Sequence, residues 1–296
     1  MIFVFCFKAP LLAWAADTPV SDKDVVPQHA SQEILRASGA EDTIEERPSF
    51  PSRVYRDLNG AVSTAWDDFT HFHSAPARMK PINLLWTGGL LAVGGIIYAY
   101  DQDIYDALQR NRDNRYYMPI REAGEFFEPL GYMGFTNKFI FATLGIGYLL
   151  DNEWSVAVTS DLLESFLIGS LVKNGVMVSA GRRGPSRDMG ARSFKTGDGR
   201  SFYSGHSNAI MQFATIMSHH VDYRPFTITS YGIVGTVLLQ RVTSDAHWPC
   251  DVYFGALWGY LVSSEMLKHK RLRNVTLTTA SPWGGDSPGL TLAMRF

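Results

Sequence analysis

Apolar segments of helical length dominate the chain between residues 81 and 268. Short polar connections separate them, and within most of them the charged positions are few. This pattern of apolar runs with short links is typical of antiparallel helices packed around a shared core. It predicts a mostly α fold, a helical bundle of six or more helices. The segments are residues 82–100, 139–150, 154–172, 209–218, 226–240 and 252–266.

The two ends of the chain have a different character. Residues 1–16 are apolar and end in small residues, which predicts a signal peptide or, alternatively, an N-terminal anchor. Residues 17–80 form a polar N-terminal arm, and we expect little fixed structure up to about residue 60. Residues 81–268 form the helical domain. The C-terminal tail, residues 269–296, begins with a basic run and ends in alternating residues around Trp-Gly-Gly-Asp, which predicts a short β-like hairpin.

Composition narrows the class of partner. The 296 residues carry a net charge of −2, which argues against nucleic-acid binding, because nucleic-acid binders usually have a basic excess. Residues 82–100 are uncharged and long enough to span a bilayer, but the mean hydropathy of −0.06 is low for a six-span protein. We therefore expect an exported protein, periplasmic or membrane-associated, with one or two spans as the alternative. Either arrangement places the site on the non-cytoplasmic side.

The first candidate site lies in residues 240–251, where Arg241, His247 and Asp251 follow the spacing R-x5-H-x3-D. Pro249 suits the first turn of a helix, so His247 should precede that helix and Asp251 should lie on its first turn. The carboxylate of Asp251 could then accept the proton of one imidazole nitrogen. That contact would leave the other nitrogen of His247 free to attack an electrophile.

The second candidate site is the sequence Ser204, Gly205, His206 in front of a predicted helix. A glycine-containing turn at a helix N-terminus offers unpaired backbone N–H groups to an anion, and His206 can act as a general acid. Arg241 adds donors that suit phosphate oxygens. Together the two candidate sites indicate phosphoryl transfer through a histidine.

The two stretches resemble the second and third signature motifs of the type 2 phosphatidic acid phosphatase superfamily, which also holds bacterial class A acid phosphatases and vanadium-dependent haloperoxidases. The family's P-S-G-H reads Tyr203-Ser-Gly-His here, and its S-R-x5-H-x3-D has Gln240 in place of the serine. The resemblance extends over about residues 84–267. It implies a helical phosphatase-like domain.

The family's first motif, K-x6-R-P, is altered in this chain. Met177 and Gly184 occupy the positions of its lysine and arginine. Lys173 lies one helical turn before Met177 on the same face, so we expect its side chain to supply the missing lysine. The missing arginine is expected to be replaced from the run that follows, by Arg182, Arg183 or Arg187.

The resemblance implies a phosphatase that hydrolyses a phosphate monoester or diphosphate, of a lipid or a small molecule, through a phosphohistidine and without a metal or cofactor. His247 would attack phosphorus, Asp251 would orient His247, and His206 would protonate the leaving oxygen. The phosphate-binding set would be Arg241, Ser204, Gly205, Lys173, Arg182 and Arg183. One alternative is an inactive relative that acts as a binding or scaffold protein. Another is a vanadate-dependent haloperoxidase that uses the same site.

Other polar residues receive interpretations outside catalysis. His71 and His73 are spaced as on a strand, and no cluster of ligands flanks them, so no metal site is assigned. Asp161 and Glu164 share a helical face and are interpreted as structural groups. The loop of residues 187–200 is either a solvated loop or one that faces the site, in which case it could lend a cation, namely Arg192, Lys195 or Arg200.

Overall fold

The computed structural model describes residues 50–273, 275–278 and 291–294. The predicted signal peptide or anchor, residues 1–16, and most of the predicted arm lie outside these residues. The chain divides into two compact units, residues 1–60 and residues 61–296. Every helix from α4 onwards belongs to the second unit.

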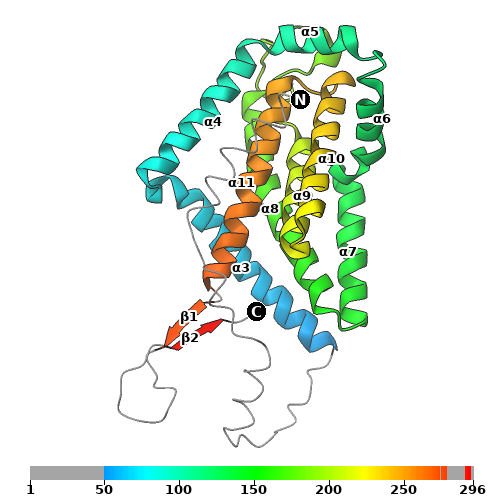
Figure 1. The fold of residues 1–296 in the computed structure, drawn as a ribbon. Helices are drawn as coiled ribbons and strands as arrows, with labels where there is room; N and C mark the ends of the chain where they lie inside the picture. The colour runs from blue at the N-terminus through cyan, green and yellow to red at the C-terminus, as the bar shows by residue number, and fades with distance from the viewer. Residues whose placement is uncertain (1–49, 274, 279–290, 295–296) are drawn as a thin grey trace, which may run out of the picture. The chain divides into compact units, whose positions relative to one another are not determined.

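The described part of the chain is predominantly helical, which confirms the predicted fold class (Figure 1). The predicted apolar segments correspond to six separate helices. The elements are α3 (Phe50–Arg78), α4 (Pro81–Ala99), α5 (Asp101–Asn111), α6 (Met118–Phe127), the 3-10 helix η2 (Glu128–Gly131), α7 (Met133–Leu149), α8 (Glu153–Ala180), the 3-10 helix η3 (Pro185–Arg187), α9 (Gly205–Val221), α10 (Arg224–Thr243) and α11 (Pro249–Arg273).

Helix α3 corrects the expectation of little fixed structure up to residue 60, because it begins at Phe50. It also places His71 and His73 on a helix, where the sequence spacing had suggested a strand. The reason lies in its apolar spacing. Phe69 and Phe72 are three residues apart and therefore share one helical face. Both pack against the buried core.

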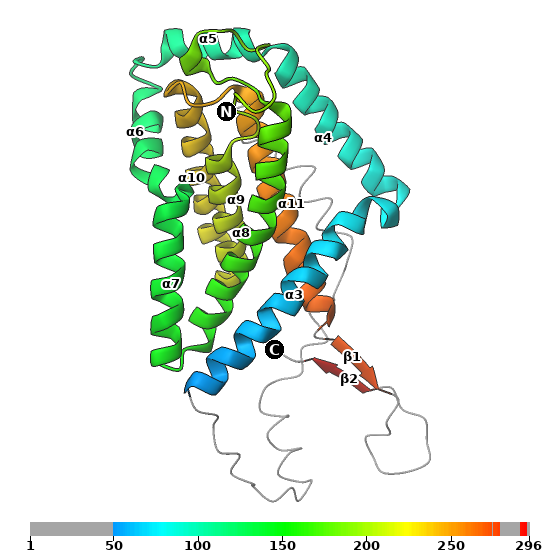
Figure 2. The ribbon, with the colours of Figure 1, turned by 180° about the vertical axis from the view of Figure 1, so that it is seen from behind.

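The core of the second unit lies between α8, α9 and α11, which run side by side (Figure 2). Its fully buried side chains include Leu162 on α8, Ile216 on α9 and Val262 on α11. Glycines bring α9 and α11 close: a Cβ added to Gly255 would lie 2.4 Å from the carbonyl oxygen of Ser204. This contact holds the N-terminal turn of α9 against the first turns of α11, where the candidate site residues are.

The described tail is a short antiparallel ribbon of β1 (Val275–Thr278) and β2 (Thr291–Met294). The register pairs Val275 with Met294 and Thr278 with Thr291. This agrees with the predicted β-like tail. The predicted turn between the strands lies outside the described residues.

Two of the described helices, α4 and α8, are long and apolar enough to cross a membrane, judged by length and composition alone. They differ in burial. Helix α8 contributes several side chains to the core. In its most apolar stretch 44% of the residues are buried, against 6% in the corresponding stretch of α4. Large apolar side chains of α4, such as Leu85 and Ile96, are more than half exposed. Helix α4 is therefore the better candidate for contact with an apolar phase.

Candidate active site

His247 lies in the connection between α10 and α11, as the position of Pro249 predicted. Its backbone N–H donates to the carbonyl oxygen of Arg241, 3.2 Å away, and its Nδ1 lies 3.0 Å from the carbonyl oxygen of Ser201. A carbonyl oxygen can only accept, so Nδ1 carries the proton in the neutral ring. The lone pair of the neutral imidazole is therefore on Nε2, which can act as a nucleophile.

Helix α5 holds this connection from the other side. Tyr105 and Gln109 both donate to the carboxylate of Asp245, the Gln109 bond being 2.7 Å long. The ring of Tyr105 also packs edge-on against Trp248, with ring centroids 5.0 Å apart. The residues on both sides of His247 are thus fixed by a helix that the apolar pattern did not predict.

Asp251 lies on the first turn of α11, as predicted, but its partners correct the predicted contact. Its oxygens accept from Arg182 Nη1 at 2.6 Å, Ser201 Oγ at 2.5 Å and the backbone N–H of Trp248 at 3.1 Å. Ser201 Oγ is in turn 3.4 Å from Nδ1 of His247. The link from Asp251 to His247 therefore runs through Ser201, whose carbonyl oxygen sets the tautomer.

Arg182 is not placed to bind phosphate, contrary to the prediction. Its side chain is fully buried, and Nη2 bonds Asp101 Oδ2 at 2.6 Å while Nη1 bonds Asp251. Nε and Nη2 also donate to the carbonyl oxygen of Ala191. Burial raises the pKa of both carboxyl groups, and Arg182 opposes that rise. A buried charge needs such partners, so Arg182 is committed to holding the first turn of α11.

Arg183 also differs from its predicted role. Its Nη2 lies 2.6 Å from Asp198 Oδ2, and Arg187 binds the other oxygen of the same carboxylate at 2.9 Å. The carbonyl oxygen of Arg183 accepts from the indole N–H of Trp248 at 2.8 Å. These contacts fold the loop of residues 187–200 back on itself, and they occupy the guanidinium that was expected at the phosphate.

The side chain of Lys173 lies beside the first residue of α9. A Cβ added to Gly205 would lie 3.4 Å from Nζ of Lys173, so the ammonium group lies at the N-terminus of α9. Burial and then the positive charge of Arg200 lower the pKa of this ammonium. Arg200 is exposed and forms no hydrogen bond to another described residue. The positive charge of Arg200 therefore acts on the ammonium group of Lys173.

Gly184, at the position of the family's arginine, lies against the His247 connection. A Cβ there would be 3.3 Å from the carbonyl oxygen of Ala246 and 3.5 Å from Ser201 Oγ. The position thus borders the site, and glycine leaves it without a charge. Arg200 directly precedes Ser201 in the chain, and its charge acts on Lys173.

Ser204 is the N-cap of α9, and its hydroxyl oxygen accepts from the backbone N–H of Ser207 at 3.3 Å and from Ser207 Oγ at 2.9 Å. Its own N–H donates to the carbonyl oxygen of Asp251 at 3.0 Å. The Ser204 side chain is fully buried. It therefore positions the helix end, and the first backbone N–H groups of α9, beginning at Gly205, are the donors left for an anion.

His206, on the first turn of α9, packs edge-on against Tyr132 with ring centroids 4.3 Å apart. Its Nε2 is buried and has no hydrogen-bond partner within the described part of the chain. Burial, followed by the charge of Arg241, lowers the pKa of His206 to about 4. Burial also lowers the pKa of His247 to about 4. Both imidazoles are therefore neutral at pH 7 before an anion binds.

Arg241 is oriented by two side chains. Its Nε donates to Gln240 Oε1 at 2.7 Å, and its Nη2 pairs with Glu128 of η2. Gln240 Nε2 also donates to Glu128 Oε2 at 3.2 Å. Gln240, which replaces the family's serine, thus holds the arginine. Nη1 of Arg241 makes no hydrogen bond to any described residue and remains for an anion.

Sequence reasoning missed Asp101, Glu128 and Ser201. Asp101 is the acidic residue that directly follows the apolar run of residues 82–100, and Ser201 lies three residues before Ser204. Proximity to a motif could have singled out Ser201. No motif lies near Glu128 in the sequence, and its contact with Arg241 depends on where the folded chain places η2.

The chain is similar to known proteins of one family. Residues 160–273 match the model of the PAP2 superfamily. No curated protein matches the chain at a significant level. LpxE of Aquifex aeolicus is a similar solved structure, with 16% identity, a TM-score of 0.44, and coverage of 56% of this chain and 93% of LpxE. A transmembrane PAP2 type phosphatidylglycerolphosphate phosphatase from Bacillus subtilis has 18% identity, a TM-score of 0.43, and coverage of 62% and 94%. The family match confirms the resemblance drawn from the two motifs.

Proposed function

We propose, starting from the membership of residues 160–273 in the PAP2 superfamily, that this protein is a phosphatase acting on a phosphate monoester or diphosphate of a lipid or small molecule. The observation that carries the proposal is the position of Lys173. Its ammonium group lies at the N-terminus of α9, where the backbone N–H groups and His206 also converge. The charges of Lys173 and Arg241 both act on His206 and His247, so the four side chains form one cluster.

In the proposed mechanism, Nε2 of His247 forms a bond to phosphorus while the bond from phosphorus to the leaving oxygen breaks. Nε2 of His206 gives its proton to that oxygen. Lys173, Arg241, Arg200 and the N–H groups of α9 stabilise the negative charge on the other phosphate oxygens. Water then forms a bond to phosphorus and loses a proton to His206, while the bond from phosphorus to Nε2 of His247 breaks and inorganic phosphate is released. The chain's own residues supply every group in these steps, and we propose that no metal takes part.

The inactive-relative alternative rests on Met177 and Gly184, which leave the first motif without its cations. The position of Lys173 favours activity, because its ammonium group lies at the N-terminus of α9 and is within reach of the charge of Arg200. No contact in the described residues specifically favours the haloperoxidase alternative.

For location, we propose an exported, membrane-associated protein with the site on the non-cytoplasmic side. The apolar residues 1–16 and the exposed apolar side chains of α4 support association with a membrane. Labelling of single surface cysteines introduced near the site, from outside intact spheroplasts, tests the orientation. Labelling only after lysis would contradict it.

Loss of the cations at α9 should reduce turnover strongly. We expect Lys173→Ala to lower kcat/KM for an aryl phosphate about 100-fold, because one donor to a developing anion contributes about 2.7 kcal/mol. Arg200→Ala should lower it about tenfold or more, and Lys173→Arg should retain part of the activity. Lys195→Ala is the matched control, because this exposed lysine belongs to the same loop as Arg200. Equal activity in Lys173→Ala, Lys195→Ala and wild type would contradict the assignment.

The pKa values predict an acidic optimum. The reaction needs neutral His247, protonated His206 and the substrate dianion, whose second pKa is about 6. With both histidines at a pKa of about 4, the product of these fractions is constant between about pH 4 and pH 6. It falls about tenfold per pH unit above pH 6, because His206 loses its proton while the dianion no longer increases.

A pH series of kcat/KM on an aryl phosphate measures this plateau. In His206→Gln the alkaline slope should disappear along with most of the activity. An optimum above pH 8 in the wild type would exclude His206 as the acid with the lowered pKa.

A further inference from the structure

Three side chains form a triangle of hydrogen bonds beside the candidate active site, namely Glu128 of η2 with Gln240 and Arg241 of α10. Arg241 Nε donates to Gln240 Oε1 at 2.7 Å, Arg241 Nη2 donates to Glu128 Oε1, and Gln240 Nε2 donates to Glu128 Oε2 at 3.2 Å. Gln240 and Arg241 are buried, and the Glu128 side chain is 18% exposed. Within the described ranges no other carboxylate pairs with Arg241, so Glu128 is its counter-charge.

The element that carries Glu128 is fixed by contacts outside this triangle. Before it, α6 packs closely on α10, since a Cβ added to Gly124 would lie 2.4 Å from the carbonyl oxygen of Thr236. After it, Oγ1 of Thr136 on α7 donates to the carbonyl oxygen of Leu130 at 2.9 Å. The carboxylate of Glu128 is therefore presented to α10 from a fixed point, as the support of a reacting group requires.

The other end of η2 meets the proposed general acid. A Cβ added to Gly131, the last residue of η2, would lie 3.1 Å from the carbonyl oxygen of His206 and 3.2 Å from Cδ2 of its ring. The next residue, Tyr132, packs edge-on against the same ring. One short element thus contacts Arg241 through its first residue and His206 through its last.

The effect of the Glu128 charge on an anion depends on Arg241. Burial, followed by the charge of Arg241, lowers the pKa of His206, and the charge of Glu128 opposes that decrease. The carboxylate therefore acts electrostatically within the site, where by itself it would repel an anion. Paired with Arg241, it orients the guanidinium and leaves Nη1 for the anion. Its contribution should be favourable with Arg241 present and unfavourable without it.

We propose that Glu128 is a positioning residue for the reaction, which with Gln240 holds the Arg241 guanidinium in the orientation that leaves Nη1 for the phosphate. The proposal rests on the proposed phosphatase function. Gln240 stands where the family has a serine, and its amide both accepts from Arg241 and donates to Glu128. An amide at position 128 could not complete the triangle, because one donor would face another whichever way the two amides turn.

The test is a double-mutant cycle on Glu128→Gln and Arg241→Ala in the full-length protein. We expect Glu128→Gln alone to lower kcat/KM for an aryl phosphate about 10- to 100-fold, because a misplaced donor no longer matches the transition state. In the Arg241→Ala background the same substitution should cause no loss, or a gain, because the carboxylate there only repels the anion. A loss of equal size in both backgrounds would overturn the proposal.

Calorimetric titration with orthovanadate measures the same cycle as anion affinity and does not depend on turnover. Glu128→Gln should weaken vanadate binding in the wild-type background and not in Arg241→Ala. A wild type that binds vanadate without hydrolysing the ester would contradict the phosphatase function, and the cycle of affinities would still decide the role of Glu128. A wild type that neither hydrolyses the ester nor binds vanadate would overturn both proposals.

Glu125→Gln is the matched control. Glu125 lies three residues earlier on α6, where its half-exposed carboxylate is 3.4 Å from Arg121 Nε. This variant should keep the turnover and the vanadate affinity of the wild type. Circular dichroism verifies folding, and if Glu128→Gln does not fold, the cycle is measured with Glu128→Asp, which keeps the charge and shortens its reach. Glu128→Asp should show a smaller loss that again disappears in the Arg241→Ala background.

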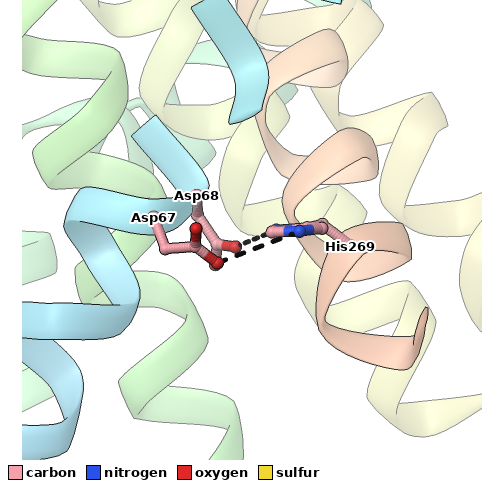
Figure 3. A group of neighbouring side chains, drawn as sticks. All are labelled: Asp67, Asp68 and His269. Carbon is pink, nitrogen blue, oxygen red and sulfur yellow. Dashed lines mark hydrogen bonds and ion pairs between the residues drawn. The ribbon is translucent and has the colours of Figure 1, made fainter. Parts of the chain in front are cut away.

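A second control lies at the far end of α11, where Asp67 and Asp68 of α3 point toward the ring of His269 (Figure 3). Nδ1 of His269 is 2.5 Å from Asp68 Oδ1. His269 lies 18 residues after Asp251 on the same helix, about 27 Å away. His269→Gln changes a partner of a buried carboxylate remote from η2 and should leave kcat/KM and vanadate affinity unchanged. A loss in this variant equal to that in Glu128→Gln would overturn the assignment of a specific role to Glu128.

Discussion

The variant His247→Ala is expected to lose about 10⁴-fold or more in kcat/KM, because it lacks the nucleophile of the proposed reaction. In the structure, Nδ1 of His247 faces the carbonyl oxygen of Ser201 at 3.0 Å, which leaves the lone pair on Nε2. Alanine removes that lone pair and leaves the anion-binding groups in place. Steady-state hydrolysis of an aryl phosphate, in the presence of a chelator, measures the loss.

Two controls separate the loss of a nucleophile from a loss of structure. His219→Ala changes the same residue type at the other end of α9 and should retain wild-type turnover. Free imidazole should restore part of the activity of His247→Ala, because it can enter the space left by the side chain. Activity of His247→Ala within a few-fold of the wild type would rule out His247 as the nucleophile.

Replacing Arg182 with methionine is expected to lower the free energy of unfolding by about 3–5 kcal/mol. The change leaves Asp101 and Asp251 buried without their shared cation, and Arg182 is fully buried between them. Methionine retains most of the side-chain volume beside Tyr98, Phe194 and Trp248. The decrease in the free energy of unfolding therefore measures the loss of the positive charge. Urea unfolding of both proteins at pH 7 measures it.

Arg183→Met is the neighbouring control. Arg183 pairs with Asp198 near the surface, where water screens the interaction, so its removal should change stability much less. Lowering the pH should narrow the difference between Arg182→Met and wild type, because protonated carboxyl groups no longer need the cation. Equal destabilisation by the two substitutions would contradict the role of Arg182 as the shared cation of Asp101 and Asp251.

Much of the fold followed from the apolar pattern, because the core is built from long apolar helices. The six predicted segments are the helices α4 and α7 to α11, and Pro249 begins α11 as its fixed φ favours. Helices α5 and α6 were missed, since charged residues interrupt their apolar positions. Helix α3 was missed because its apolar face is narrow and the surrounding composition is polar.

The candidate site was predictable where it depends on local spacing. Lys173 was placed by helical periodicity, and Ser204 and Gly205 by the signature of a helix start. Periodicity also placed Asp251 on the first turn of α11. Its partner could not be predicted, because Arg182 and Asp101 come to it from 69 and 150 residues earlier in the chain.

The adjacent residues Arg182 and Arg183 have different roles that the sequence did not distinguish. Arg182 and Arg183 are equivalent as sequence, yet one is buried between two carboxylates and the other folds a surface loop. Which of them is buried depends on how the chain leaves α8 through Gly181, whose φ of 57° is left-handed. Glycine adopts that conformation without strain, so the turn is compatible with the sequence but not dictated by it.

In the proposed reaction a phosphoryl group is transferred to His247 before it reaches water. The most direct test is rapid acid-free quenching of the enzyme with a ³²P-labelled substrate, followed by peptide mapping of the label. We expect label that is stable to base, labile to acid and located on the peptide containing His247, and none in His247→Ala. A wild-type enzyme that turns over substrate while its label appears on another residue would contradict the account.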